Sequence, residues 1–294
     1  MANLSFSPDH QWRRLLARIL TEGTTIAPRS LPTRELLGST TTVLLAHPVL
    51  EVPGRDLGYR FLCAEAAWLL DGDNRVATIA PYSKEIARFS DDGLTFAGAY
   101  GPPLRDQLPW VATQLLTDPA TRQAVAVIWR PRPGPSKDVP CTVALQWLLR
   151  PSASGTDQLH CVATMRSSDA WLGWPYDVFN LSVLSAYLGA VLLHRGYPAP
   201  LALGRLHLTA GSQHLYAPQW DRAQRCLAEP ERPATLAAPL DSTAWAADPD
   251  ALARDLWATA RSDGTGSVCS PFLVELTRFV IARHNQRLVQ RQEA

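Results

Sequence analysis

Lysine is nearly absent from this sequence of 294 residues, in which Lys84 and Lys137 are the only two. The 28 basic side chains are therefore almost all arginines, and with 27 acidic side chains they leave a net charge of +1. Without an excess of positive charge, broad binding to nucleic acid through its phosphate backbone is not expected. A local anion-binding pocket is compatible with this balance.

Long apolar runs and paired cysteines are also missing. No apolar run reaches the roughly 18 residues that span a bilayer, and the N-terminus lacks the basic-then-apolar order of a signal peptide. We therefore expect a cytoplasmic protein with no membrane contact. No CxxC pair occurs, which argues against a disulfide framework and a cysteine-based zinc site. The five widely spaced cysteines are Cys63, Cys141, Cys161, Cys226 and Cys269.

Composition and length are those of a soluble globular protein. Hydrophobic residues make up 46% and charged residues 19% of the chain, which excludes a charge-rich disordered protein. A chain of this length forms one large domain or two small ones. No internal repeats or low-complexity tracts divide it, so we expect a single domain over residues 1–294.

Helical and strand patterns are mixed without the strict order of a βαβ fold. Ser7 followed by Pro8 is typical of a helix start. Further helices are expected at residues 59–70, 108–116 and 178–194, with a last one beginning at Ser270. Strands are expected at residues 40–46, 124–129, 142–149, 158–165 and 201–208. This mixture predicts an α+β fold, with a mixed β-sheet packed by helices around the long helix at 178–194. The proline- and alanine-rich residues 230–250 are expected to form a surface excursion.

Several side chains could carry chemistry. Cys141 follows a proline-rich loop at the start of a predicted strand, although a cysteine there is more often a small buried apolar residue. Glu65 lies in an otherwise apolar helix, where a carboxylate needs a partner or a water-filled cavity. Arg166 begins a polar, tryptophan-containing segment that we expect to be a loop, while His214 and Tyr216 follow a strand. Taken one at a time, these residues also have structural explanations.

The order of these segments along the chain resembles that of the thymidylate synthase family. The matching motifs are Glu-x-x-Trp at 65–68, GAYG at 98–101, Thr-Arg at 121–122, Pro-Cys at 140–141, RSSDAWLGWPYD at 166–177 and GSQHLY at 211–216. The resemblance covers about residues 29–228, and a C-terminal extension of about 229–294 matches less clearly. It implies a homodimer that acts on a pyrimidine nucleotide, with 5,10-methylenetetrahydrofolate as co-substrate and no metal.

The resemblance also implies roles for single residues. Cys141 would be the nucleophile that adds to C6 of the pyrimidine, and Arg166 would stabilise its thiolate. Glu65 would organise water and proton transfers at the base, and Tyr100 would lie near the nucleophile. The implied ligands of the nucleotide phosphate and sugar are Arg29, Arg166, Ser167, His214, Tyr216 and, from the neighbouring subunit, Arg122. The implied folate-side wall consists of Asp169, Leu172, Gly173 and Tyr176.

Three positions depart from the thymidylate synthase pattern. Asp177 stands where synthases have an asparagine that pairs with uracil, and a carboxylate accepts a hydrogen bond from the amino group of cytosine. Cytosine N3 is an acceptor too, so this pairing needs a proton shared between N3 and Asp177, which would also activate C6. Thr142 follows the cysteine where synthases usually have histidine, and Gln123 replaces the second of two arginines in the phosphate clamp. The residues at 177 and 142 resemble the cytidylate hydroxymethylase branch.

The expected function is therefore folate-dependent 5-hydroxymethylation of a cytidine nucleotide. The arginine-, proline- and alanine-rich composition favours an actinobacterial enzyme that prefers CMP over dCMP and supplies 5-hydroxymethyl-CMP to a nucleoside antibiotic of the mildiomycin type. The enzymatic alternatives are a phage-like dCMP hydroxymethylase and a pyrimidine nucleotide methylase of the thymidylate synthase type. An inactive member that binds a nucleotide or RNA is the alternative of another class. No single residue selects the sugar.

Overall fold

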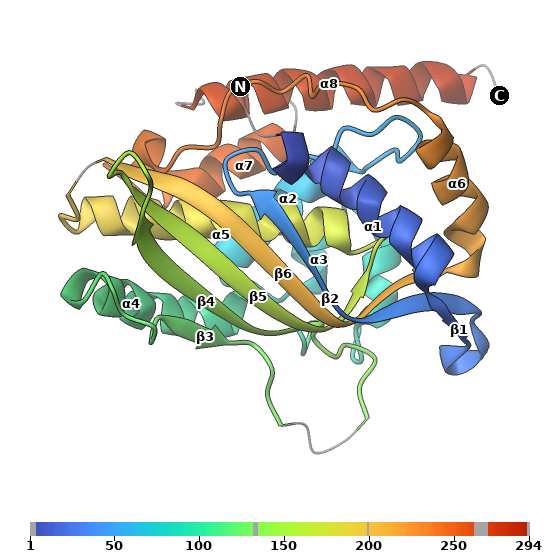
Figure 1. Ribbon diagram of the computed structural model, residues 1–294, viewed down its shortest axis with the longest axis horizontal. Coiled ribbons are helices and arrows are strands. Elements are labelled where there is room, and N and C mark those ends of the chain that lie inside the picture. The colour runs from blue at the N-terminus through green and yellow to red at the C-terminus, as the bar shows by residue number, and fades with distance from the viewer. Residues whose placement is uncertain (1–3, 132–134, 199, 262–269, 293–294) are drawn as a thin grey trace.

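The fold is built on one mixed β-sheet with most of its helices on one side. The computed structural model describes residues 4–131, 135–198, 200–261 and 270–292. The six strands follow the order β1-β2-β6-β5-β4-β3 across the sheet (Figure 1), and all neighbours are antiparallel except β5 and β6. Their bounds are β1 Thr24–Ile26, β2 Thr33–Leu44, β3 Val125–Val127, β4 Thr142–Pro151, β5 Asp157–Asp169 and β6 Leu201–Tyr216.

Helix α5 (Trp174–His194) is the connection between the two parallel strands and forms the centre of the core. Parallel neighbours cannot be joined by a hairpin, so the chain crosses over one face of the sheet in this helix. By length and composition α5 could cross a membrane, with a mean hydropathy of 1.5, but 72% of its apolar stretch is buried inside the protein. Its apolar residues are therefore explained by packing between the sheet and the outer helices.

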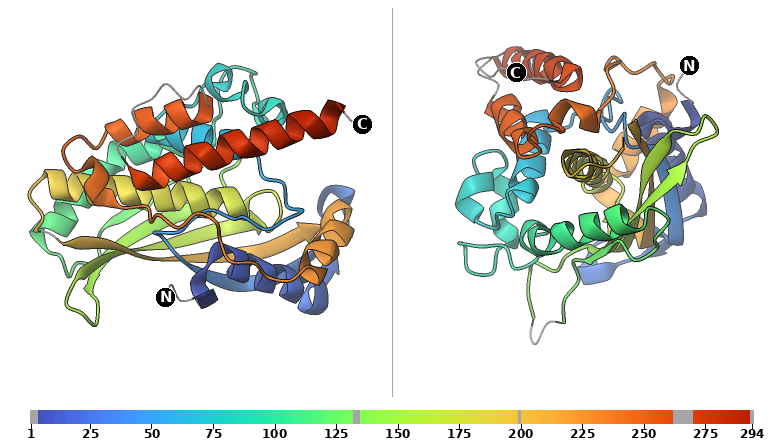
Figure 2. Two further views of the ribbon diagram at one scale, coloured as in Figure 1. Left: turned by 90° about the horizontal axis from the view of Figure 1, so that it is seen from above. Right: turned by 90° about the vertical axis from the view of Figure 1, so that its left-hand side faces the viewer.

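The remaining helices form layers around α5 and the sheet. Figure 2 shows α2, α7 and α8 on the same side of the sheet as α5, with α8 outermost. Helices α1 and α6 pack together near β2. The α-helices other than α5 are α1 Pro8–Glu22, α2 Tyr59–Leu70, α3 Val76–Ile79, α4 Gly101–Thr117, α6 Trp220–Ala228, α7 Ala251–Arg261 and α8 Pro271–Gln292. The short 3-10 turns are η1 Leu4–Phe6, η2 Pro28–Ser30, η3 Lys84–Phe89, η4 Ala217–Gln219 and η5 Ser242–Trp245.

The α+β fold and several predicted element positions are confirmed. The Ser7 hydroxyl accepts a hydrogen bond from the His10 N–H and caps α1, and α2 has the predicted bounds. Helices α4 and α5 begin earlier than predicted, at Gly101 and Trp174. Both helices have proline in the first turn. Backbone N–H groups there have no partner within the helix, so the missing N–H of proline costs no hydrogen bond.

Two predicted loops are instead strand. The segment that begins at Arg166 continues β5 as far as Asp169, and β6 runs on through His214 to Tyr216. The two extensions pair with each other, with Asp169 opposite His214. Their polar sequences gave no strand pattern, because this part of the sheet is ordered by pairing rather than by a buried apolar face.

The proline-rich segment at 230–250 is less superficial than predicted. Leu240 and Trp245 are each 1% exposed. The Leu240 N–H donates to the Ala46 carbonyl, and the Trp245 indole donates to Asp255 at 3.0 Å. The segment is therefore anchored in the core at two points, because its few large apolar side chains are buried there.

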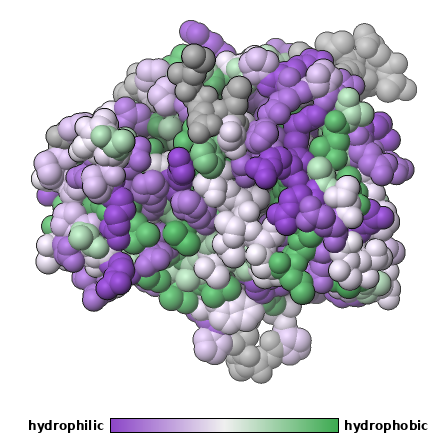
Figure 3. Space-filling model, in the orientation of Figure 1, coloured by the Kyte–Doolittle hydropathy of each residue, from purple (hydrophilic) through white to green (hydrophobic). Residues whose placement is uncertain are grey.

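One face of the sheet is left open by the helices and is seen in Figure 3. It mixes small polar residues such as Thr40 with apolar ones, and Leu37 is 77% and Val127 is 47% exposed. Large apolar side chains at such exposure are typical of surfaces that contact another protein.

Candidate active site

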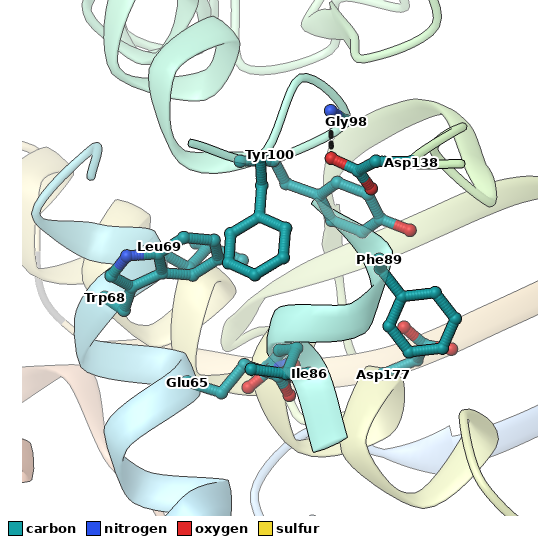
Figure 4. Close-up of a pocket in the computed structure, with 12 residues that line it drawn as sticks. Glu65, Trp68, Leu69, Ile86, Phe89, Gly98, Tyr100, Asp138 and Asp177 are labelled. Carbon is teal, nitrogen blue, oxygen red and sulfur yellow. Dashed lines mark hydrogen bonds between the residues drawn. The ribbon is translucent and has the colours of Figure 1, made fainter. Parts of the chain in front are cut away.

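A partly open cavity of about 200 Å³ lies between α2, η3, α5 and the loops before α4 and β4. Figure 4 shows Glu65 and Asp177 on its lower side, with Tyr100 and Asp138 above them. Most of the remaining wall is apolar. The lining residues are Glu65, Trp68, Leu69, Ile86, Phe89, Phe96, Gly98, Ala99, Tyr100, Asp138, Asp177 and Asn180.

Cys141 lies immediately before β4, beside Arg166 of the neighbouring strand β5. The guanidinium Nη2 of Arg166 is 3.8 Å from the Cys141 Sγ and also donates to the Val139 carbonyl at 2.9 Å. The Tyr100 hydroxyl accepts from the backbone N–H groups of Cys141 (3.2 Å) and Thr142 (3.1 Å). The structure thus brings the predicted nucleophile, its arginine and the predicted tyrosine together.

The thiol of Cys141 is held mainly in its neutral form. Burial raises its pKa, and the negative charge of Asp177 acts in the same direction. Arg166 lowers the pKa, as the sequence predicted, but not enough to outweigh burial. In the protein without ligand, the arginine therefore limits the cost of forming a thiolate and does not produce one by itself.

The two carboxyl groups Glu65 and Asp177 reach the cavity from different helices. Burial raises the pKa of Glu65 to about 7, and a hydrogen bond from Asn180 opposes that effect. Burial, with the charges of Glu65 and Asp169, raises the pKa of Asp177 to about 8. At neutral pH Asp177 is therefore mainly a carboxylic acid, which can donate as well as accept a hydrogen bond.

A second cavity, of about 720 Å³, shares Phe89 with the first and is lined by cations. Arg29, Arg88, Lys137 and Arg166 line it, and no carboxylate does so among the residues that the structure describes. Four cations around one hollow favour a doubly charged anion such as a phosphate. Its other lining residues are Phe89, Trp129, Ser136 and Val139.

The ends of β5 and β6 carry the other predicted nucleotide ligands. Ser167 is opposite Ser212 in the parallel register, and His214 is 7% exposed. The rings of His214 and Tyr216 meet edge to face at 5.0 Å, and the Tyr216 hydroxyl accepts from Arg29 at 3.3 Å. These contacts connect the predicted sugar residues to the cation-lined cavity.

The predicted folate-side residues form the turn between β5 and α5. The Asp169 carboxylate accepts from the N–H groups of Trp171 and Leu172 at 2.7 and 2.9 Å, and the Leu172 side chain is 52% exposed. Gly173 precedes α5, and the Tyr176 hydroxyl accepts from the Gly58 N–H at 3.1 Å. An exposed leucine beside a carboxylate fits a second substrate that is apolar and bears hydrogen-bond donors.

Arg122 stands apart from both cavities of its own chain. Its side chain is exposed just before β3, and its carbonyl accepts from Gln146 at 2.8 Å. Four other residues at the cavities were missed from the sequence: Arg88, Lys137, Asp138 and Asn180. Asn180 carried a usable signal, as a polar residue in the apolar helix, and Lys137 stood out only as one of two lysines.

The fold places a cation-lined cavity beside a cysteine and two buried carboxyl groups. A sequence profile described as Thymidylate synthase matches residues 10–244. The chain belongs to the thymidylate synthase family.

Two phage proteins are among the relatives of this chain. It is 29% identical over 231 residues to the deoxyuridylate hydroxymethyltransferase of Bacillus phage SP01. The aligned region covers 71% of this chain and 57% of the relative. It is 34% identical over 161 residues to the deoxyuridylate hydroxymethyltransferase of Pseudomonas phage M6, covering 50% of this chain and 44% of that protein. The chain thus spans about half the length of these relatives. Both are named for hydroxymethylation of a pyrimidine nucleotide, which agrees with the predicted hydroxymethylase branch, but the base in both names is uracil and not the predicted cytosine.

Proposed function

We propose that this protein transfers a one-carbon unit from 5,10-methylenetetrahydrofolate to C5 of a cytidine monophosphate and releases the 5-hydroxymethyl nucleotide. The proposed substrate is CMP in preference to dCMP, in a cytoplasmic pathway to a nucleoside antibiotic of the mildiomycin type. The observation that carries the proposal is the buried acid of Asp177 near Cys141, at a position where thymidylate synthases have asparagine; the preference for cytosine rests on that replacement. Such an acid matches cytosine, since it donates to N3 and accepts from the amino group at C4.

The cation-lined cavity would bind the 5′-phosphate. Arg29 and Arg166 were assigned to it from the sequence, and Arg88 and Lys137 line the same space. Tyr216, which is bonded to Arg29, and His214 beside it would bind the sugar. Binding at this end places the base toward the thiol, because Arg166 reaches both the cavity and Cys141.

The covalent step would begin at Cys141. Its Sγ forms a bond to C6 and releases its proton to solvent, while the proton on Asp177 passes to N3 and the electron pair of the C5–C6 double bond makes C5 nucleophilic. Methylenetetrahydrofolate supplies the one-carbon unit at C5 and departs as tetrahydrofolate. The proton at C5 passes to solvent, so an exocyclic methylene group remains on the nucleotide.

Water would complete the reaction. Its oxygen bonds to the methylene carbon and one of its protons passes to Glu65. The C6–Sγ bond then breaks, N3 returns its proton to Asp177, and the thiolate recovers a proton from solvent, which restores the ring and the thiol. Glu65 and Asp177 line the same cavity, and two polar acids there favour retained water. In a methylase, a hydride from the folate would reach the same carbon and yield dihydrofolate.

Deoxyuridylate is the second candidate substrate, because two relatives are named for it. A neutral acid at position 177 can also pair with uracil, by donating to O4 and accepting from N3–H. Competing CMP, dCMP, UMP and dUMP in one reaction, with mass analysis of the products, decides between the bases. We expect 5-hydroxymethyl-CMP as the main product, with ¹⁸O incorporated from labelled water. Dihydrofolate formed in step with nucleotide conversion would establish a methylase instead.

The active form proposed here is a homodimer formed through the open face of the sheet. Exposed Leu37 and Val127 on this face support it. Arg122 lines neither cavity of its own chain, so it is available to the phosphate site of a second copy. Sedimentation should give twice the chain mass, and an inactive Cys141→Ala chain mixed with an Arg122→Ala chain should regain activity.

A further inference from the structure

Asn180 lies at a buried position in α5. An apolar side chain at this position would leave fewer buried polar atoms without a hydrogen-bond partner. It is 8% exposed, and its neighbours Phe179 and Leu181 are 0% and 1% exposed. Its Nδ2 donates to the Glu65 carboxylate at 2.8 Å. Its Oδ1 is buried without a hydrogen-bond partner in the part of the chain that the structure describes. A buried amide whose carbonyl oxygen has no hydrogen-bond partner lowers the stability of the protein. The hydrogen bond from Nδ2 to Glu65 is therefore the feature that needs an explanation.

The amide acts on Glu65 in one direction only. An ionised carboxylate accepts and cannot donate, so an N–H directed at it stabilises the charged form and fixes the orientation of the carboxyl plane. This hydrogen bond is the influence that opposes burial and keeps the pKa of Glu65 from rising further.

Among the described residues, no other side chain donates a hydrogen bond to the Glu65 carboxylate. Asp177 of α5, Asp138 and Tyr100 are the other ionisable side chains at the same cavity. A negative charge on Asp177 or Asp138 disfavours a charge on Glu65, and the Tyr100 hydroxyl accepts from the backbone N–H groups of Cys141 and Thr142. Helices α4 and α7 place no ionisable side chain in the cavity wall that the structure describes.

We propose that Asn180 is a positioning residue that holds the Glu65 carboxylate at the cavity wall, where Glu65 takes the proton of the attacking water. Asn180 acts on the reaction only through Glu65. The inference rests on the proposed function for the role of Glu65, whereas the contact between the two side chains does not depend on it. The amide is retained at some cost in stability because it serves this contact.

Replacing Asn180 by leucine tests the proposal, because the stability of the protein should be kept or increased while its activity at low pH should decrease. Asn180→Leu removes the unmatched carbonyl, so the urea midpoint of unfolding should stay equal or rise. The acid limb of the pH profile of kcat should move up by about one pH unit, the shift expected when a charged carboxylate loses one hydrogen bond. Asn180→Ser, which retains a short donor, should shift the limb less and carries the same test if the leucine variant does not fold.

Two controls isolate the contact. Ser182→Ala removes another buried polar group from α5, one whose hydroxyl donates to the Val178 carbonyl, and should leave the pH profile in place. In a Glu65→Gln background, Asn180→Leu should cause no further loss of kcat, because the two changes remove one function.

A direct titration separates this proposal from the proposed function. Difference infrared spectroscopy of the ligand-free protein, with Glu65→Gln to assign the band, should show the Glu65 carboxyl titrating at higher pH in Asn180→Leu. An unmoved band together with a lower urea midpoint would show a structural role and overturn the proposal. A shifted band with an unchanged pH profile of turnover would preserve the contact but overturn its part in the reaction, and with it the role of Glu65 in hydration.

Discussion

The guanidinium of Arg166 lies between the sulfur of Cys141 and the cation-lined cavity, with its Nη2 3.8 Å from Sγ. Its Nε donates to the Pro140 carbonyl at 2.9 Å and its Nη2 to the Val139 carbonyl, so it also fixes the loop that carries the cysteine. One side chain therefore joins anion binding to the position of the thiol.

Turnover should depend on the Cys141 thiol, while nucleotide binding should not. Cys141→Ala and Cys141→Ser should abolish turnover, because no other described cysteine lies beside Arg166. CMP should still bind in calorimetry, since the cation-lined cavity is intact. Alanine or serine at Cys63, Cys161 or Cys226 should preserve most activity. A Cys141→Ala protein that kept a tenth of the wild-type rate would exclude the cysteine as nucleophile.

Turnover of CMP should fall as the pH rises from 7 to 9. With a pKa of about 8, Asp177 is mainly neutral at pH 7 and mainly ionised at pH 9. The ionised form has no proton to pass to N3 of cytosine and faces that acceptor with a lone pair, so kcat/KM for CMP should decrease over this range. A kcat/KM that stays flat to pH 9 would show that Asp177 supplies no proton at N3.

Asp177→Asn should shift the preference toward uridylate. An amide can donate to O4, but it cannot pass a proton to N3 of cytosine. One hydrogen bond to a charged group is worth about 1.5–3 kcal/mol, so the CMP-to-UMP ratio should fall about tenfold or more. The ratio is measured with both nucleotides in competition.

Lys137 should contribute to phosphate binding. Lys137→Gln removes one of four cations from the cavity and should raise KM for CMP roughly tenfold with a smaller effect on kcat. Cytidine, which has no phosphate, should bind equally to both proteins. Arg18→Gln is the matched control, because Arg18 pairs with Glu22 on the exposed side of α1. Equal effects on cytidine and CMP would remove Lys137 from the phosphate site.

Gly98 should be required at its position because of the close approach of Asp138. The Gly98 N–H donates to the Asp138 carboxylate, and a Cβ at position 98 would lie 2.7 Å from Asp138 Oδ1 and 2.8 Å from its carbonyl oxygen. Gly98→Ala should therefore displace the loop before Cys141 and lower kcat. Adding Asp138→Ala should not restore it, since the backbone oxygen still collides. Recovery in the double variant would show that only the carboxylate is crowded.

The unfolding free energy of the ligand-free protein should decrease as the pH rises from about 4 to about 8. Burial raises the pKa of Asp9 and of Glu65 to about 7 and that of Asp177 to about 8, so in this range the folded protein binds more protons than the unfolded chain. Urea denaturation at several pH values measures this slope. Asp177→Asn should reduce it, and an unchanged slope would mean that Asp177 is not buried as the structure shows.

The sequence by itself determined the family, the α+β class and most of the elements. The residues of α2 form an apolar helix with Glu65 in it, and Ser7 with Pro8 begins α1 as predicted. The motifs around Cys141 and Arg166 identified the candidate reactive residues, because local sequence carries their chemical identity. These features depend on residue types and short spacings, which are visible without a fold.

Only the tertiary structure decided how the groups affect one another. The strand extensions that carry Arg166 and His214 form by pairing between β5 and β6, which are separated by the whole of α5 in the chain. The pKa of Asp177 depends on burial and on Glu65 from another helix, and the contact of Asn180 with Glu65 joins residues 115 positions apart. Desolvation and hydrogen bonding are properties of neighbours in space, so a linear pattern contains the groups but not their protonation states.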